Sequence, residues 1–423
     1  MGHMSSPMQN LKMGIIGIGA MGKGLLYQSS ITEGIDTVAI CDIDLPRCTD
    51  TLEWLGYDYR LVSNAREMAD VIDAGQIAVC TDGELVAGCA RLDAVIEASG
   101  SIIPAARFAI TALEEKKHLI LMNSEIDLIF GPYLKHLAQQ NQVVCTSCDG
   151  DQYGAMKHLI DDIRSWGFEL VMAGNIKGFL DRYANPSMII EEADKRNLDY
   201  RACTSYTDGT KLNIEMALIA NAIGMQTKIT GMLGPAAGHV SAVLKIFDFK
   251  SLWKRGEPLV DYILGADPGG GVFIVGYCDN EYQREMLRYY KMGEGPFYLF
   301  YRHYHLCHIE AMNTVLDAVR NGRALMQSDH GFRTNVYSYA KRDLNPGDIL
   351  DGIGGYSCYG LIENRTDNEN EVGIPICLAE NVVVRRTVKK DQKIMWEDVV
   401  YDEERLDFKL YKLSCQIGGG TAK

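Results

Sequence analysis

The sequence lacks the long apolar runs that a membrane protein needs. No stretch of it reaches the roughly 18 consecutive apolar residues of a membrane span, and no signal peptide precedes the first predicted strand. Basic residues are also in the minority, with 42 Lys and Arg against 56 Asp and Glu and a formal net charge of −14. Such a chain has no general affinity for nucleic acid or anionic membrane. We therefore expect a cytoplasmic protein that binds a small molecule.

Paired cysteines are scarce as well. The 12 cysteines are spread singly, mostly inside apolar runs such as IAVC and VVC, which predicts buried free thiols rather than a disulfide scaffold. Cys145 and Cys148 form one CxxC, but no second pair and no flanking histidine complete a metal set. A structural role is the favoured interpretation of this pair.

What the sequence does contain is a glycine-rich turn near its start. An apolar run at 13–16 leads into Gly17-Ile18-Gly19-Ala20-Met21-Gly22, and a second strand-like run ends directly before Asp42, about twenty residues further on. The glycines permit a sharp turn, a close approach of backbone N–H groups to a pyrophosphate, and tight helix packing. The helix N-terminus then faces the phosphates with its partial positive charge. A plain tight turn is the alternative. The spacing predicts a dinucleotide site formed by Gly17, Gly19, Ala20, Met21, Gly22 and Asp42.

Asp42 also indicates which dinucleotide binds. Its carboxylate is placed to accept hydrogen bonds from the adenosine ribose hydroxyls, and together with Asp44 it would repel a 2′-phosphate. Arg47 is the only nearby cation that would favour such a phosphate. We expect NAD rather than NADP.

The patterns along the chain predict three domains. Residues 11–150 alternate between strand and helix patterns, which is typical of an α/β, doubly wound parallel sheet of the Rossmann type. Its strand at 93–100 ends in Ser99 and Gly100, and the strand at 118–125 runs into Asn123, so we expect these three residues on the nicotinamide side of the cofactor.

The second predicted domain, residues 151–335, is an α+β substrate and dimerisation domain, so a homo-oligomer is expected. Within it we expect a charged helix at 191–202, then a strand that leads through the turn Asp208-Gly209 into a helix. Residues 336–423 show short strand and turn signals with no long helix between them, which predicts a small β-rich module.

Several of these segments together resemble a known family. GIGAMG, DGTK and the stretch GEGPFYLFYRHYHL are similar to the homoserine dehydrogenase-like oxidoreductases that carry a C-terminal SAF domain, and among them to the 1-deoxy-D-xylulose 5-phosphate reductoisomerase-like proteins. The resemblance extends to MNSEIDLIFGPYLK, EMALIANAIGM and the SAF-like AKRDLNPGDIL. It implies an NAD(P)-dependent enzyme with a SAF-like domain at 336–423. The reductoisomerase-like proteins use NADPH and carry basic residues where this chain has Asp42 and Asp44.

Hydride transfer at a carbinol carbon needs a group that handles the hydroxyl proton and a donor to the developing alkoxide. Lys211, in DGTK just before a helix, and Lys177, at the end of a strand, are the candidates. Homoserine dehydrogenases use a lysine with nearby acids, so the resemblance associates Asp208 or Glu215 with Lys211. A solvated surface charge is the alternative for either lysine.

Carboxylates gather after two predicted strands of the first domain. Glu125, Asp127, Asp149 and Asp151 lie at or just past the strand ends, where substrate binds in such sheets. If the substrate were a ketose phosphate, its rearrangement would need a divalent cation, and Mg²⁺ or Mn²⁺ prefers oxygen ligands of this kind. Capping and turn roles are the alternative.

Basic and aromatic side chains concentrate at a strand-to-helix junction near residue 303. Arg302, Tyr304 and His305, with His303 and His308 beside them, form the best local site for a phosphate or carboxylate of the substrate. Packing and capping are the alternative.

Three functions remain open on the sequence. The substrate is expected to be a small polar hydroxy or keto compound, polyhydroxylated or phosphorylated. The protein is then a rearranging reductoisomerase, a simple dehydrogenase of the homoserine type, or a non-catalytic NAD-bound sensor or scaffold.

Overall fold

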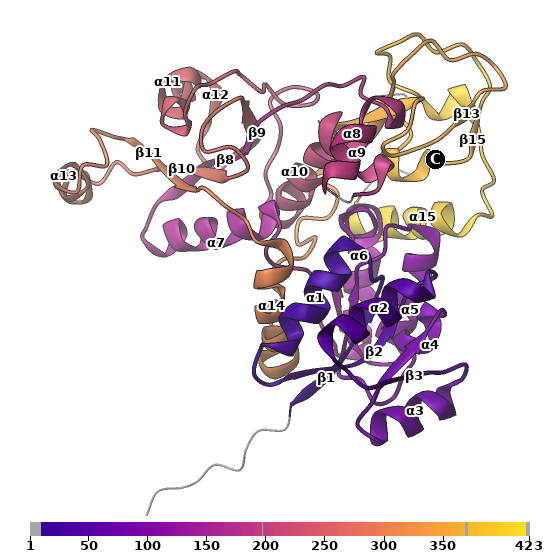
Figure 1. The fold of residues 1–423 in the computed structure, drawn as a ribbon. Coiled ribbons are helices and arrows are strands. Elements are labelled where there is room, and N and C mark those ends of the chain that lie inside the picture. The colour runs from indigo at the N-terminus through magenta and orange to yellow at the C-terminus, as the bar shows by residue number, and fades with distance from the viewer. Residues whose placement is uncertain (1–9, 197, 369–370, 420–423) are drawn as a thin grey trace, which may run out of the picture. The chain divides into compact units, whose positions relative to one another are not determined.

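The computed structural model describes residues 10–196, 198–368 and 371–419. Backbone contacts divide the chain into two compact units (Figure 1). The first unit runs up to Gly150 and also includes Leu306–Gln327, and the second comprises Asp151–His305 and Ser328–Lys423. The segment predicted as a β-rich module thus belongs to the same unit as residues 151–305.

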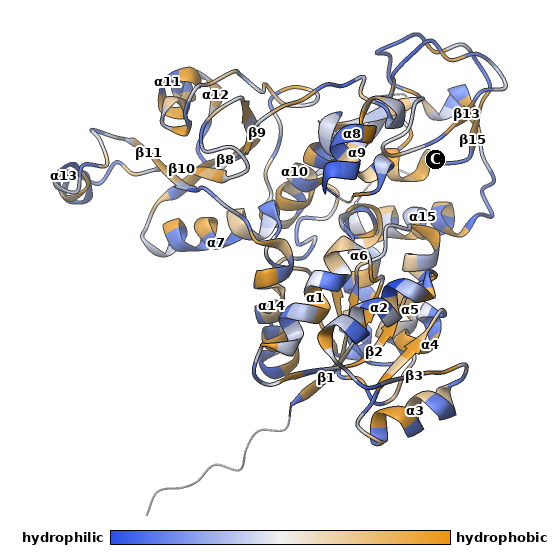
Figure 2. Cartoon of the chain, viewed as in Figure 1, coloured by the Kyte–Doolittle hydropathy of each residue, from blue (hydrophilic) through white to orange (hydrophobic). Residues whose placement is uncertain are grey.

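The first unit is built on a parallel seven-stranded sheet in the order β3-β4-β2-β1-β5-β6-β7. Its strands carry mostly hydrophobic residues (Figure 2), because helices cover both faces of such a sheet. The strand order reverses between β1 and β5, which is where ligands bind in doubly wound sheets. The predicted Rossmann-type fold is confirmed. The strands are β1 (Leu11–Ile16), β2 (Ile35–Cys41), β3 (Tyr59–Leu61), β4 (Ile77–Cys80), β5 (Ala94–Glu97), β6 (His118–Leu121) and β7 (Cys145–Ser147).

A helix from much later in the chain completes the first unit. In α14, Ala311, Met312 and Val315 pack in the same apolar cluster as Leu25 and Leu26 of α1. The helices of this unit are α1 (Ala20–Ser30), α2 (Leu45–Leu55), α3 (Ala65–Asp73), α4 (Gly83–Ala87), α5 (Ile103–Glu114), α6 (Ser124–Asn141) and α14 (Cys307–Asn321).

The second unit contains a four-stranded sheet in the order β11-β10-β8-β9. Strands β8 and β9 are parallel and the other pairs are antiparallel. Ile176 of β8 packs in an apolar cluster with Val240, Val243 and Phe247. Because side chains alternate along a strand, Asn175 and Lys177 point to the opposite face of the sheet. The strands are β8 (Glu169–Lys177), β9 (Leu259–Leu264), β10 (Val272–Tyr277) and β11 (Phe297–Arg302).

Helices and short strands surround this sheet. Helix α7 packs on β8 and β10, and α10 packs on β9 and also on β12 and β14 of the C-terminal segment. The helices are α7 (Gln152–Ser165), α8 (Ile190–Arg196), α9 (Tyr200–Thr207), α10 (Thr210–Ile223), α11 (Val243–Ile246), α12 (Phe249–Leu252) and α13 (Glu281–Tyr289).

The C-terminal segment is rich in β-structure, as predicted, but it ends in an unpredicted helix. Strands β12 (Thr334–Ala340) and β14 (Cys358–Asn364) pair, and β13 (Ile349–Leu350), β15 (Val382–Val384) and β16 (Val399–Val400) form a small sheet. Helix α15 (Leu406–Gly418) buries Phe408, Leu410 and Tyr411.

The strand expected just before Asp208 is wrong, because this stretch is helix α9. Asp199 caps the helix by accepting a hydrogen bond from Ala202 N at 3.0 Å. Cys203 is buried in a small apolar cluster that includes a residue of α8. The Thr204 hydroxyl donates to Tyr200 O at 2.8 Å, which lets a β-branched residue fit the helix. The single charged helix expected at 191–202 is accordingly two helices, α8 and α9.

Among the described residues, none of the helices has the combination of length and hydrophobicity that a membrane-spanning segment needs.

Candidate functional site

Glycine occupies the three positions of the N-terminal turn for different structural reasons. Gly17 has φ +95°, and a Cβ there would lie 2.7 Å from Ser99 N. A Cβ on Gly22 would lie 1.9 Å from Gly17 O, so only glycine lets α1 pack this closely. Gly19 has nothing within 4 Å of its Cβ position. The space in front of α1 is therefore open at this position. Gly19 is the N-cap of α1 and has no side chain to cap the first N–H groups of that helix, so these groups can bind an anion.

Asp42 joins this turn to the end of β2. Its side chain is buried; Oδ2 accepts from Ile18 N at 2.7 Å and Oδ1 accepts from Asp44 N at 2.9 Å. Each carboxylate oxygen retains capacity for a further hydrogen bond. The nearby cation Arg47 is paired with Asp44, at 3.0 Å from Nε to Oδ2. These residues fit a dinucleotide with a free ribose 2′-hydroxyl better than one with a 2′-phosphate.

The loop after β5 is held by two buried side chains. Oε1 of Glu97 accepts from Ser99 N at 2.9 Å, and Asn123 Nδ2 donates to Ser99 O at 2.9 Å and to Ser101 O at 2.8 Å. Complete burial raises the pKa of Glu97 to about 8. Asn123 thus shapes the loop through its amide, while Gly100 has nothing within 4 Å of its Cβ position. The sequence pattern did not single out Glu97.

Three of the four predicted catalytic residues come together in the second unit. Lys177 ends β8, Asp208 precedes α10, and Glu215 lies one turn into that helix; both carboxylates are buried. Lys177 Nζ donates to Tyr206 O at 2.7 Å. Desolvation lowers the pKa of Lys177, and the negative charges of Glu215 and Asp208 oppose that shift. The Lys177 amine is therefore easier to deprotonate than an ordinary lysine.

Lys211, the fourth predicted residue, lies in the first turn of α10. It is four positions before Glu215, a spacing that places the two side chains on the same face of a helix. Both have interactions within the protein.

Two further residues near this cluster were not predicted from the sequence. Asn175 shares its strand face and is 1% exposed, and neither amide atom has a hydrogen-bond partner among the described residues. A buried amide of this kind ordinarily binds water or a polar ligand group. Lys341, from the C-terminal segment, places Nζ 2.8 Å from Asp208 Oδ2. Burial raises the pKa of Asp208, and the Lys341 ammonium opposes this.

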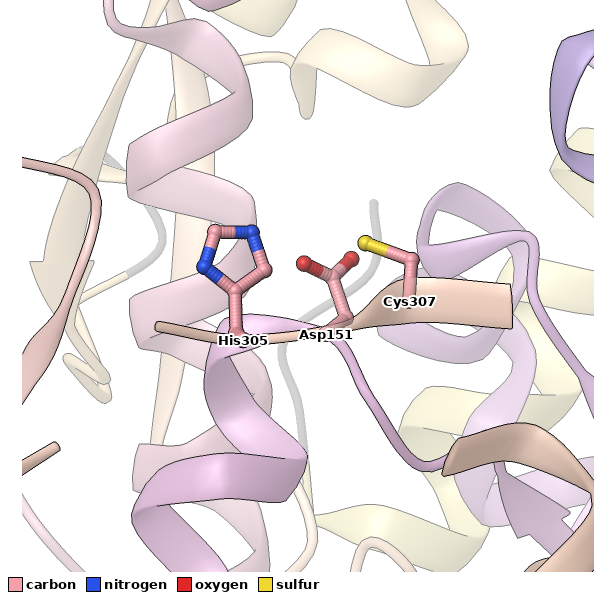
Figure 3. A group of neighbouring side chains, drawn as sticks. All are labelled: Asp151, His305 and Cys307. Atoms are coloured by element: carbon pink, nitrogen blue, oxygen red, sulfur yellow. The ribbon is translucent and has the colours of Figure 1, made fainter. Parts of the chain in front are cut away.

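Asp151 and His305 lie close together in the second unit (Figure 3). One ring nitrogen of His305 and one carboxylate oxygen of Asp151 are within 4.8 Å of each other. His305 Nδ1 is 2.8 Å from Gly270 O, and because a carbonyl only accepts, Nδ1 donates this hydrogen bond. The hydrogen bond fixes the orientation of the ring and leaves Nε2 free of this contact. Cys307, also drawn in Figure 3, belongs to the first unit.

The predicted substrate residues are divided between the two units. Glu125, in the first turn of α6, and Asp149, just after β7, belong to the first unit. In the second unit, Arg302 stacks over the ring of Tyr304 at 4.2 Å, at the end of β11 that leads to His305. The predicted strand-to-helix junction around residue 303 is confirmed, since α14 begins at Cys307.

A family model matches the part of the chain that holds the lysine cluster. Residues 150–311 match the model described as oxidoreductase DRL, catalytic domain. The matched range includes Asn175, Lys177, Asp208, Lys211 and Glu215. The middle of the chain is therefore similar to an oxidoreductase catalytic domain. No curated protein sequence matches the chain.

Solved structures similar to the chain are distant. An oxidoreductase from Agrobacterium radiobacter, in complex with NAD⁺, L-tartaric acid and magnesium, is 14% identical over 40% of this chain and 46% of that one, with a TM-score of 0.30. The 1-deoxy-D-xylulose 5-phosphate reductoisomerase from Zymomonas mobilis with NADPH is 11% identical over 49% and 57%, with a TM-score of 0.35. GenD2 from gentamicin A biosynthesis, with NAD, is 11% identical over 75% and 89%, with a TM-score of 0.37. The chain spans about half the length of the first two structures.

Proposed function

We propose that the protein is an NAD(P)-dependent oxidoreductase that prefers NAD and acts on a small polar hydroxy or keto substrate, polyhydroxylated or phosphorylated. The observation that carries the proposal is the group formed by the half-buried Lys177 and the buried carboxylates of Asp208 and Glu215, which lies within the segment that matches an oxidoreductase catalytic domain. The glycine turn and Asp42 of the first unit support the proposal that the protein binds this cofactor.

When bound, the nicotinamide would supply or accept the hydride. Lys177 handles the proton at the substrate oxygen: its ammonium donates to a carbonyl oxygen during reduction, and its neutral amine accepts the hydroxyl proton during oxidation. Both directions require a lysine that changes protonation state easily, and desolvation lowers the pKa of Lys177 accordingly. The carboxylates of Glu215 and Asp208 limit that shift, so the ammonium form remains accessible.

Cationic and polar side chains are available for the substrate end of the site. Arg302 and His305 offer cationic or hydrogen-bonding groups to a phosphate or carboxylate, and the aromatic ring of Tyr304 holds the Arg302 guanidinium. Asn175, with its buried amide, is a candidate contact for a substrate hydroxyl.

The resemblance favours a sharper version of this function, a reductoisomerase-like reaction with a SAF-like C-terminal segment. That reaction needs a divalent cation such as Mg²⁺ or Mn²⁺ on adjacent substrate oxygens. Within the second unit, Asp151 and His305 lie close enough together to be candidate ligands for such a cation. Glu125 and Asp149 of the first unit remain candidate substrate residues. A simple dehydrogenase of the homoserine dehydrogenase type is the alternative, and its turnover would survive a chelator.

The experiment is a turnover screen with purified protein. NAD and NADP are each combined with polyols, sugar phosphates and amino alcohols, and absorbance at about 340 nm reports the reduced nicotinamide. Lys177→Met should lower kcat/KM about 100- to 10,000-fold, the usual contribution of a general acid–base group, and leave NAD binding unchanged. Lys250→Met, at an exposed position in α12, is the matched control.

Two outcomes would contradict the proposal. One is a protein that binds neither nicotinamide nucleotide. The other is a Lys177→Met variant that turns over as fast as the unaltered chain. NAD binding without turnover of any substrate would favour the sensor or scaffold alternative.

A further inference from the structure

Lys341 connects the C-terminal segment to the cluster of Lys177, Asp208 and Glu215. It follows directly after β12, and its side chain is 3% exposed. Its ammonium lies 2.8 Å from Asp208 Oδ2 and donates to Ala184 O at 2.6 Å and Gly355 O at 2.7 Å. Lys341 is thus held by one ion pair and two hydrogen bonds to backbone carbonyls.

The same C-terminal segment holds the loop that follows Lys177. The Tyr183 hydroxyl donates to Asp391 Oδ2 at 2.9 Å, and the Lys390 ammonium lies 3.5 Å from the centre of the Tyr183 ring. Ser187 Oγ and the Tyr356 hydroxyl share a hydrogen bond of 2.7 Å. With the Lys341 contact to Ala184 O, the loop between β8 and α8 is therefore attached at three points to residues far along the chain.

We infer that Lys341 is a positioning residue of the catalytic cluster: it keeps Asp208 ionised beside Lys177 and fixes the loop after β8, so the C-terminal segment is a working part of the catalytic unit. Its effect on turnover rests on the proposed function, whereas its effect on the charge of Asp208 does not.

The electrostatic reason is the cost of a buried charge. A carboxylate as buried as Asp208 becomes neutral unless a cation compensates it, and Lys341 is the cation that contacts it. The charged groups that act on Lys177 are the carboxylates of Glu215 and Asp208 and the guanidinium of Arg196. If Lys341 is removed and Asp208 takes up a proton, Lys177 loses one of its two negative neighbours. Its ammonium form is then less favourable.

The test uses two variants and a matched control. Lys341→Met removes the cation, and the double variant Asp208→Asn with Lys341→Met removes both charges and so avoids leaving an unpaired carboxylate in the interior. Lys393→Met breaks another lysine–carboxylate pair of the C-terminal segment, with Glu363 at 2.8 Å, and serves as the control.

The readouts are the pH profile of kcat/KM and the NMR titration of methylated lysines, with the Lys177 signal assigned by Lys177→Arg. Both Lys341 variants should move the Lys177 titration downward by about one pH unit, equivalent to a tenfold change in its proton affinity, and Lys393→Met should leave it in place. If Lys341→Met does not fold, the double variant still tests whether the charge of Asp208 acts on Lys177, on which the inference depends.

An unshifted Lys177 titration in a folded double variant overturns the inference. A shifted titration in a protein that turns over no substrate upholds the inference and counts against the proposed function. Turnover that depends on Lys177 but has the same pH profile in all three variants upholds the function and overturns the role of Lys341.

Discussion

Glu97 makes the stability of the first unit depend on pH in an unusual direction. The residue ends β5, is fully buried, and has one carboxylate oxygen, Oε2, without a hydrogen-bond partner among the described residues. Burial raises its pKa from 4.5 to about 8. The folded state therefore binds this proton more tightly than the unfolded state does. Glu97→Gln replaces the carboxyl group with an amide of the same shape that has no charge at any pH.

The magnitude follows from linkage. Below pH 4.5 the Glu97 carboxyl is protonated in both the folded and the unfolded state, and the folded state has its full stability with respect to this group. As the pH rises towards 8, the unfolded chain releases the proton and the folded chain keeps it, so stability falls by about 1.4 kcal/mol per pH unit. The loss over the whole interval is about 5 kcal/mol, as an order of magnitude. The glutamine variant lacks this loss.

The assay is urea unfolding of both proteins at pH 5, 6, 7, 8 and 9 (roughly the range over which a raised carboxyl pKa acts), followed by hydrogen exchange of peptides from β5. The stability of Glu97→Gln relative to the unaltered chain should increase with pH up to about pH 8 and then level off. Glu115→Gln, at an exposed position just after α5, is the control and should show no such trend. A constant difference between Glu97→Gln and the unaltered protein at every pH would refute the reasoning.

Two further predictions concern the glycine turn. Gly22→Ala should lower the melting temperature and abolish NAD binding, because its Cβ would lie 1.9 Å from Gly17 O. The Gly19→Ala variant has nothing within 4 Å of the added Cβ, so its melting temperature should be unchanged and only its affinity for the cofactor should fall, as measured by NADH fluorescence. A Gly19→Ala protein that does not fold would contradict this. Asp42→Ala should weaken the binding of NAD much more than the binding of NADP in the same titration, because the carboxylate favours a free 2′-hydroxyl. Equal losses for both nucleotides would count against the expected preference.

The sequence alone determined those features that depend on residues close together in the chain. The strand, glycine turn and helix at 11–30, and the acid that follows β2, were predicted because their residue types and spacing within about 30 residues form one known pattern. The same holds for Lys177 at the end of β8, and for the junction near residue 303. The helix α9 was predicted incorrectly, since its threonines favour strands until their hydroxyls bond to the preceding turn.

Only the tertiary structure decided what surrounds those features. Helix α14 joins the first unit although most of the second unit precedes it in the chain. Lys341 forms an ion pair with Asp208, and the side chains of Asn175 and Glu97 are buried. No local sequence pattern predicts these features. The physical reason is that burial and ion pairing depend on which distant segments pack against a residue, and a buried charge is stable only where such a segment brings its partner. Periodicity records the face a residue occupies, but not the segment that covers it.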